Sequence, residues 1–236
     1  MILSDLMAVA ALLASAATTE VSQENSAESP ALSASDGVVQ PHEDQVGEQF
    51  LADETDDLSD QELLVKIIGG IEQTTTMTSD FTQIAPSGAV ATGKLYLRRP
   101  GRARFEYDEP SPILIVATQG NVYVEDRELE QTDSYPIKQT PLKYLLNKNV
   151  DLEGVTVVGT ERFEDTLAVT VKANDDETDG ELTLVVSLPD YKLMAWSILD
   201  SQNGVTIVEL ANQEYGVKIA NSRFRTPEAG GAFINN

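Results

Sequence analysis

The chain has 236 residues, with 39 Asp and Glu against 16 Lys and Arg, and the resulting formal net charge of −23 opposes nucleic-acid binding. Hydrophobic residues make up 41% of the chain, which is enough for a globular core. Cysteine is absent, which excludes disulfides, thiol nucleophiles and cysteine-ligated metals and is compatible with an oxidising compartment.

The first 17 residues are predicted to be a secretory signal peptide. Leu6 to Ala17 form an apolar run that is shorter than the roughly 20 residues needed to span a bilayer. Ala14-Ser15-Ala16 is a small-x-small site of the kind that signal peptidase cleaves. The residues before this run include Asp5 and no Lys or Arg, which leaves two alternatives: a start codon assigned too late, or an unstructured terminus.

Residues 18–58 are predicted to form an acidic disordered linker. They contain no Lys or Arg and few large apolar side chains. Such a segment buries too little apolar area to offset backbone ordering, which costs about 1–2 kcal/mol per residue. The single histidine, His42, lies here, so we expect neither a histidine base nor a metal site in the folded part.

The folded domain is expected over residues 59–226, followed by a flexible tail over 227–236, and it begins with a helix. Ser59 and Glu62 have the spacing of a capping box. The apolar face that follows repeats at three and four residues and consists of Leu64, Ile67, Ile68 and Ile71. Gly69-Gly70 weakens this helix, which therefore needs another element to pack on.

Beyond Thr74 the apolar period changes to two, which predicts a mainly β domain. The expected strands are 75–85, 90–99, 102–108, 112–118, 121–126, 154–160, 165–172, 181–188, 191–200 and 204–211, with 216–224 as a further candidate. Their short connections favour antiparallel neighbours. A second short helix is expected from Thr140 to Leu146, with Pro141 at its first position. So large a sheet curls into a barrel or half-barrel, and two short helices cannot fill it, so we expect an apolar cavity.

Four arginines cluster in one predicted hairpin, although the chain is acidic. Strand alternation points Arg98, Arg102 and Arg104 outward. There we expect them to be solvated, or to pair across strands with Glu106 or Asp108 for at most about 1 kcal/mol each.

Arg99 differs because its phase puts it on the same face as Leu95 and Leu97. A guanidinium among apolar side chains needs acceptors for its five donors. Carbonyls at the end of a covering helix would supply them, and Arg99 would then hold a lid shut with bonds of about 1–3 kcal/mol. The alternative is an ordinary structural ion pair.

Catalytic and nucleotide-binding motifs are missing or incomplete. Gly88 to Lys94 match the start of a phosphate-binding loop, but Leu95 stands where Ser or Thr is required, and a strand follows instead of a helix. The folded part has no GxSxG elbow. Distant strands could still contribute a glycosidase-type carboxylate pair, which sequence alone does not reveal.

Several segments occur in an order that indicates a family. They are Ser79–Gln83, Gly93–Tyr107 with its Arg-Pro pair, Pro110, Gln119–Val124, Thr140–Leu142 and Leu145-Leu146. Together they resemble the periplasmic lipoprotein carrier family LolA over roughly residues 60–226. The resemblance implies an incomplete antiparallel β-barrel covered by short lid helices around an apolar cavity. In the family, the Arg of the Arg-Pro pair bonds to the lid, which corresponds to Arg99 here.

The function implied by the resemblance is a non-enzymatic, monomeric periplasmic carrier that uses no cofactor or metal. Family members receive lipoproteins from an inner-membrane ABC transporter, shield their acyl chains, and pass them to an outer-membrane acceptor. The sheet residues expected to line the acyl-chain cavity are Leu95, Leu97, Phe105, Tyr107, Val122, Val124, Leu182, Leu184 and Val186. Those expected from the covering helices are Ile67, Ile71, Leu142 and Leu145.

Two alternative functions are weaker. The first is a periplasmic regulatory or scaffold module on the same fold that senses lipid or lipoprotein. Such a module would normally bring a second folded domain, and only a short tail follows Arg225. The second is an enzyme, for which no set of nucleophile and base is visible.

Overall fold

The computed structural model describes residues 58–150, 152, 154–173 and 180–226. The predicted signal peptide, nearly all of the predicted linker and the predicted tail lie outside these residues. The described residues form one antiparallel sheet of 11 strands and four helical segments. The helical segments are α2 (Asp60–Gln73), η1 (Ile137–Gln139), α3 (Leu142–Leu146) and η2 (Asn221–Phe224).

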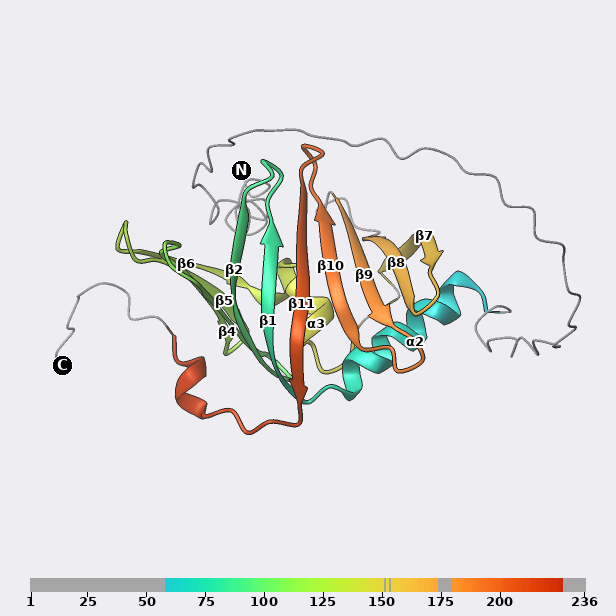
Figure 1. The fold of residues 1–236 in the computed structure, drawn as a ribbon, viewed down its shortest axis with the longest axis horizontal. Helices are drawn as coiled ribbons and strands as arrows, with labels where there is room; N and C mark the ends of the chain where they lie inside the picture. Colours follow the sequence, from blue (N-terminus) through green and yellow to red (C-terminus); the bar gives the residue numbers. More distant parts are fainter. Residues whose placement is uncertain (1–57, 151, 153, 174–179, 227–236) are drawn as a thin grey trace, which may run out of the picture.

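The sheet is an incomplete barrel. Its strands are β1 (Thr76–Ile84), β2 (Val90–Arg98), β3 (Arg102–Tyr107), β4 (Ile113–Thr118), β5 (Asn121–Asp126), β6 (Gln131–Pro136), β7 (Val155–Arg162), β8 (Thr166–Ala173), β9 (Glu181–Ser187), β10 (Leu193–Leu199) and β11 (Val205–Tyr215). Their order is β6-β5-β4-β3-β2-β1-β11-β10-β9-β8-β7. β6 and β7 are the edges and do not pair with each other, so the sheet curls without closing, and α2 and α3 lie within the curve (Figure 1). This architecture confirms the predicted fold class.

Helix α2 begins where the sequence predicts. Glu62 N–H donates to Ser59 Oγ, while the Glu62 carboxylate accepts from Ser59 N–H, so the capping box is complete. The buried face comprises Leu63, Leu64, Ile67, Ile68 and Ile71. Gly70 has a packing role: a Cβ there would lie 2.3 Å from the Tyr191 carbonyl oxygen, so only glycine allows α2 to approach the β9–β10 turn this closely.

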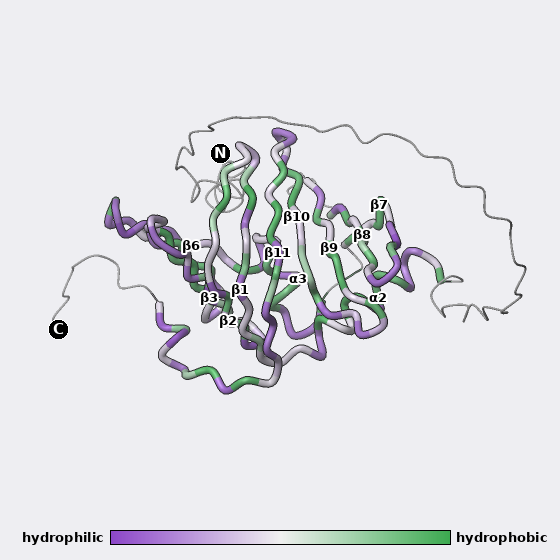
Figure 2. Tube along the Cα trace, viewed as in Figure 1, coloured by the Kyte–Doolittle hydropathy of each residue, from purple (hydrophilic) through white to green (hydrophobic). Residues whose placement is uncertain are grey.

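Alternation along the strands separates an apolar concave face from a more polar convex face. β1 and β3 alternate strictly, and their buried positions include Met77, Phe81 and Phe105. Figure 2 shows the same alternation along the tube, with hydrophilic residues gathered at the β5–β6 hairpin tip. β4 is the exception because all six of its residues are buried, which means that its convex side is covered as well.

The structure differs from the strand predictions in two places: β6 was missed, and the candidate strand 216–224 is not a strand. β6 was not predicted because its sequence, QTDSYP, presents no apolar alternation; it is a polar edge strand that ends in Pro136, as edge strands often do. Residues 216–224 do not form a strand. The chain leaves β11 at Gly216, which has a φ of 70°, and then crosses to the convex side of the sheet, where η2 contacts β3 and β4.

Candidate functional site: an apolar cavity under a two-helix lid

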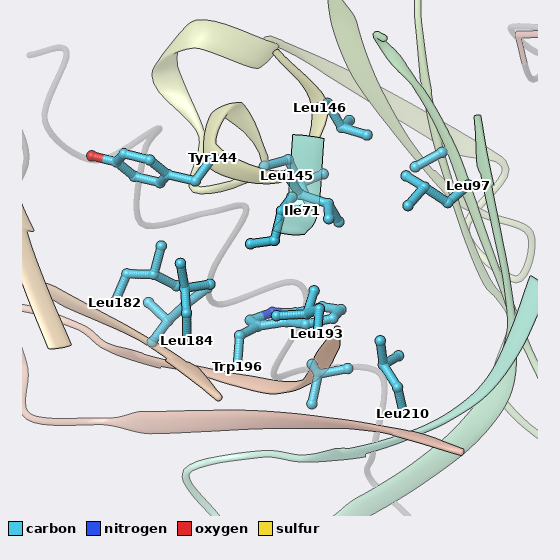
Figure 3. Close-up of a cluster of buried hydrophobic side chains, with 14 of the residues drawn as sticks. Ile71, Leu97, Tyr144, Leu145, Leu146, Leu182, Leu184, Leu193, Trp196 and Leu210 are labelled. Carbon is cyan, nitrogen blue, oxygen red and sulfur yellow. The ribbon is translucent and has the colours of Figure 1, made fainter. Parts of the chain in front are cut away.

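An apolar cavity lies between the concave face of the sheet and the two helices. Its lining residues are Ile71 from α2, Pro141, Leu142, Tyr144 and Leu145 from the α3 segment, and Phe105, Leu182, Leu184, Leu193, Trp196 and Ile198 from the sheet. None of them carries a charge. Figure 3 shows Ile71 and Leu145 on one side of the cavity and the Trp196 ring on the other. The arrangement is suited to a flexible apolar guest.

The cavity is small in this closed arrangement. Its volume is about 30 Å³, room for about two water molecules, whereas an engineered cavity that binds benzene measures about 150 Å³. Side chains of α2 and α3 therefore fill most of the interior that the sheet encloses. A larger guest requires one of the helices to move away from the sheet.

Six of the predicted cavity residues lie at the cavity. They are Ile71, Phe105, Leu142, Leu145, Leu182 and Leu184. The other seven are buried in the same apolar core without lining the cavity: Ile67, Leu95, Leu97, Tyr107, Val122, Val124 and Val186. All thirteen are buried in the same apolar core.

Sequence reasoning missed five lining residues: Pro141, Tyr144, Leu193, Trp196 and Ile198. Strict alternation along 191–200 would have found Trp196 and Ile198. It could not have found Leu193, because the β9–β10 register shifts between Leu193 and Ala195 and puts Leu193 out of phase with them. Tyr144 was missed because one turn of helix carries no usable periodicity; four of the five residues of α3 are buried.

Arg99 joins both helices to the β2–β3 hairpin. Its Nη1 donates to the Ile71 carbonyl near the end of α2, and its Nη2 donates to the Asn147 carbonyl just after α3. Gly101 N–H adds a third contact, to the Leu146 carbonyl, at 2.8 Å. The Ile71 carbonyl also accepts from Thr74 N–H at 3.1 Å, so Arg99 adds a second hydrogen bond to it, and the Asn147 carbonyl belongs to the C-cap residue of α3. One guanidinium thus connects the two helices that cover the cavity.

The Arg99 site is electrostatically costly. Partial burial lowers the pKa of Arg99, and the nearby Glu72 carboxylate opposes that shift. Arg99 Nε is buried and has no hydrogen-bond partner among the described residues. A half-desolvated guanidinium with an unsatisfied donor is a weaker clamp than a fully satisfied one. The contact is therefore able to break.

Of the three outer arginines, Arg102 is exposed as predicted, whereas Arg98 and Arg104 have partners that the sequence did not indicate. Arg104 pairs with Glu106 at 2.6 Å, but along its own strand and not across strands. Arg98 donates to the Ile219 carbonyl and to Asn221 Oδ1, and its guanidinium lies 4.8 Å from the centroid of the Phe224 ring.

These contacts of Arg98 and Arg104 arise because the C-terminal segment, residues 217–226, lies against the hairpin. The sequence did not indicate this position. Arg223 pairs with Glu106 at 3.1 Å and stacks over Tyr96, which pins the segment to the convex side of β2 and β3. Arg98 and Arg104, which donates to the Arg223 carbonyl, therefore hold this segment against the hairpin.

The described residues contain neither a candidate metal-binding cluster nor a candidate membrane-spanning helix. Within the described ranges, no three or more His, Asp or Glu residues are grouped so as to hold a metal ion. No helix among the described residues has the length and apolar character needed to cross a bilayer.

Comparison with known proteins identifies the family. The model of the family described as outer membrane lipoprotein carrier protein LolA matches residues 72–227. An outer-membrane lipoprotein carrier protein of Methylococcus capsulatus is 27% identical over 170 residues, which cover 68% of this chain and 81% of the relative.

Two solved structures give an alignment over about the same part of the chain. A putative outer membrane lipoprotein-sorting protein domain from Vibrio parahaemolyticus has a TM-score of 0.46 at 8% identity, covering 70% of this chain and 97% of the domain. The MucA/MucB complex of Pseudomonas aeruginosa has a TM-score of 0.44 at 12% identity, covering 71% of this chain and 61% of the matched chain. The match of the family model to well over half of the sequence shows that this chain belongs to the LolA family of outer membrane lipoprotein carrier proteins.

Proposed function

We propose that this protein is a periplasmic carrier that binds the acyl chains of lipoproteins in its half-barrel. It receives them from an inner-membrane ABC transporter and passes them to an acceptor in the outer membrane. The observation that carries the proposal is an uncharged, mostly aliphatic cavity covered by two helices whose ends share one arginine. Family membership and the lipoprotein carrier of Methylococcus capsulatus support it.

The cavity wall suits hydrocarbon chains energetically. Each methylene group removed from water contributes about 0.8 kcal/mol, so affinity grows with the length of chain that is sheltered. Leu182, Leu184 and Leu193 supply aliphatic contacts that adapt to a flexible guest, and Trp196 supplies a large apolar surface.

Loading displaces the lid. Because the closed cavity is far too small for an acyl chain, α3 moves outward and the bonds of Arg99 to Asn147 and to Ile71 break. The guest then replaces the side chains of α3 against the sheet. Helix α3 is the element suited to move because it has only five residues, whereas α2 is longer and packs against β7 and β8.

Release follows from competition between closed lid and guest. The lining residues include no carboxylate, amine or imidazole, and the phenol of Tyr144 is the one ionisable group among them, so they offer no acid and base pair to cut the guest. An acceptor with greater affinity removes the acyl chains, and reformation of the Arg99 bonds to both helices offsets part of the cost of emptying the cavity.

The decisive experiment is release of lipoprotein from spheroplasts. The purified protein is added to spheroplasts that make a radiolabelled outer-membrane lipoprotein, and the supernatant is assayed for a complex of the two. We expect the wild type to release the lipoprotein in stoichiometric amounts. Leu184→Glu, which places a charge in the cavity wall, should release far less than Thr183→Glu, on the opposite face of the same strand.

The outcomes separate the alternatives. No release by a folded wild type would contradict the carrier function. Lipid bound in native mass spectrometry without release of lipoprotein would favour the regulatory or scaffold module on the same fold.

A further inference from the structure

Gln83 is an exception in the apolar interior. It is 1% exposed and lies on the concave face of β1. Its Oε1 accepts a hydrogen bond from Tyr107 Oη at 2.7 Å, but its Nε2 has no partner among the described residues. Buried polar atoms in folded proteins are nearly always paired, so an unpaired amide donor in this position calls for a reason.

The register of the sheet places Gln83 on the same concave face as the cavity, two strands away from Trp196. Trp196, which lines the cavity, is directly opposite Val208 on β11, and Val208 is directly opposite Gln83 on β1. Directly paired residues share a face of the sheet, and adjacent strands lie about 4.8 Å apart. Gln83 is therefore at the same level as Trp196 and about 10 Å from it, on the same concave face.

Tyr107 orients the amide. Burial raises the pKa of Tyr107, so its hydroxyl stays protonated and donates to Gln83 Oε1. With Oε1 occupied, both hydrogens on Nε2 remain available. Phe81 packs edge-on against Tyr107 with 5.0 Å between the ring centroids and limits the freedom of the phenol ring. The result is a fixed donor among apolar side chains.

An uncharged acceptor fits this donor best. A carboxylate would bring an unpaired charge into an apolar interior, which is costly. The inward-facing arginine, Arg99, is too far away to compensate: Ala91 is paired with Gln83, and Arg99 lies eight residues beyond Ala91, about 27 Å along an extended strand. The carbonyl oxygen of an ester carries no charge and is joined directly to a hydrocarbon chain.

We propose that Gln83 is a ligand-binding residue whose Nε2 donates a hydrogen bond to an ester carbonyl oxygen of an acyl chain held in the half-barrel. This inference rests on the proposed carrier function and adds recognition of the ester linkage to shelter of the hydrocarbon. A structural role for Gln83 is the competing explanation, and it predicts no preference for esters.

The test compares two ligands of equal length. The full-length protein is loaded with the fluorescent apolar dye 1-N-phenylnaphthylamine, which is then displaced by methyl tetradecanoate or by methyl tetradecyl ether, which lacks the carbonyl. For the wild type we expect the ester to displace the dye at about fivefold lower concentration than the ether, the ratio given by one net hydrogen bond.

Three variants assign the effect. Gln83→Met/Tyr107→Phe removes the donor without leaving the phenol hydroxyl unpaired, and the ratio should fall to within about twofold of unity. Tyr107→Phe keeps the Gln83 donor but removes the bond that orients its amide, so the ester preference should fall only in part. Ser79→Ala is the matched control: Ser79 is buried on the same face of β1, but its hydroxyl already donates to the Ala211 carbonyl, so the ratio should not change.

Each outcome decides a separate point. If the two ligands displace the dye equally well from the wild type, or if the double variant keeps the preference, the role of Gln83 is refuted while the carrier function stands. If neither ligand nor dye binds a folded wild type, the proposed function itself fails and this inference with it. If the double variant does not fold, the infrared carbonyl stretch of carbonyl-labelled ester bound to the wild type decides. A shift to lower frequency supports the hydrogen bond, and a frequency equal to that in alkane refutes it.

Discussion

Replacing Arg99 by leucine should make this protein bind apolar ligands more tightly. The substitution removes the bonds to the Ile71 and Asn147 carbonyls and leaves an apolar side chain in their place. In the proposed mechanism those bonds form only in the closed, empty arrangement, so they stabilise the state that a ligand must displace. When a binding-competent state is rare, the apparent dissociation constant rises in proportion to its rarity.

The size of the effect follows from the contacts. A hydrogen bond to a charged group contributes about 1.5–3 kcal/mol net, which gives about 3–6 kcal/mol for two. Two effects offset a good part of this sum. Burying the Arg99 guanidinium is costly, as its lowered pKa indicates, and solvent screens the interactions at this half-exposed site. We take about 2 kcal/mol as the net stabilisation of the closed lid, and its loss tightens binding about 30-fold.

Dye titration measures this directly. The dissociation constant for 1-N-phenylnaphthylamine should fall by about 30-fold in Arg99→Leu, and transfer of a bound lipoprotein to its acceptor should slow because the closed lid no longer favours release. Arg102→Leu, on the exposed side of the same hairpin, is the matched control and should bind as the wild type does. An unchanged or weaker affinity in Arg99→Leu, with the fold intact, would refute the role of Arg99 as a lid latch.

Three further predictions concern stability. Gly69→Ala should raise the free energy of unfolding by about 1 kcal/mol because a Cβ there meets nothing within 4 Å. Gly70→Ala should lower the free energy of unfolding by about 1–3 kcal/mol because its Cβ would collide with the Tyr191 carbonyl. Equal denaturation midpoints for the two variants would contradict this account of α2 packing. Phe224→Ala should lower the free energy of unfolding by about 3 kcal/mol because the C-terminal segment is a packed part of the fold. Phe163→Ala, at an exposed position, should leave the free energy of unfolding within about 0.5 kcal/mol of the wild-type value. Burial raises the pKa of Tyr107 above its ordinary value of 10.0, so the stability it contributes is full below pH 10 and is lost as pH rises further. Urea titrations from pH 9 to 11 should therefore show a steeper loss for wild type than for Tyr107→Phe.

Local patterns predicted the framework of the fold well. The capping box at Ser59 and Glu62, the apolar face of α2 and the positions of ten of the strands are determined by neighbours a few residues away, and the structure confirms them. The match of the family model to residues 72–227 likewise confirms the resemblance seen in the Arg-Pro hairpin.

Features that depend on distant contacts were not predictable. β6 is a strand because β5 provides a partner for it, although its own sequence is polar. Residues 216–224 alternate enough to suggest a strand, but Arg98, Arg223 and Phe224 hold them across the convex face instead. Likewise, the β9–β10 register shift brings Leu193 to the cavity, and no sequence pattern marks a bulge of this kind.

The interior shows the limit of reasoning from sheet size alone. A large curled sheet with two helices predicted a cavity, but whether those helices stand off from the sheet or pack into it depends on contacts such as Gly70 against Tyr191 and Arg99 against Asn147. The chain adopts the packed arrangement, which makes movement of α3 the step on which the carrier function depends.

That step can be measured as a distance. The chain has no cysteine, so a pair introduced by Lys143→Cys on α3 and Glu209→Cys on β11 can be spin-labelled without other changes. Pulsed electron paramagnetic resonance then reports the distance between lid and sheet with and without methyl tetradecanoate. We predict a single shorter distance without ligand and a population at clearly longer distance with it. An unchanged distance distribution at saturating ligand would contradict the account of a half-barrel that opens to take up an acyl chain.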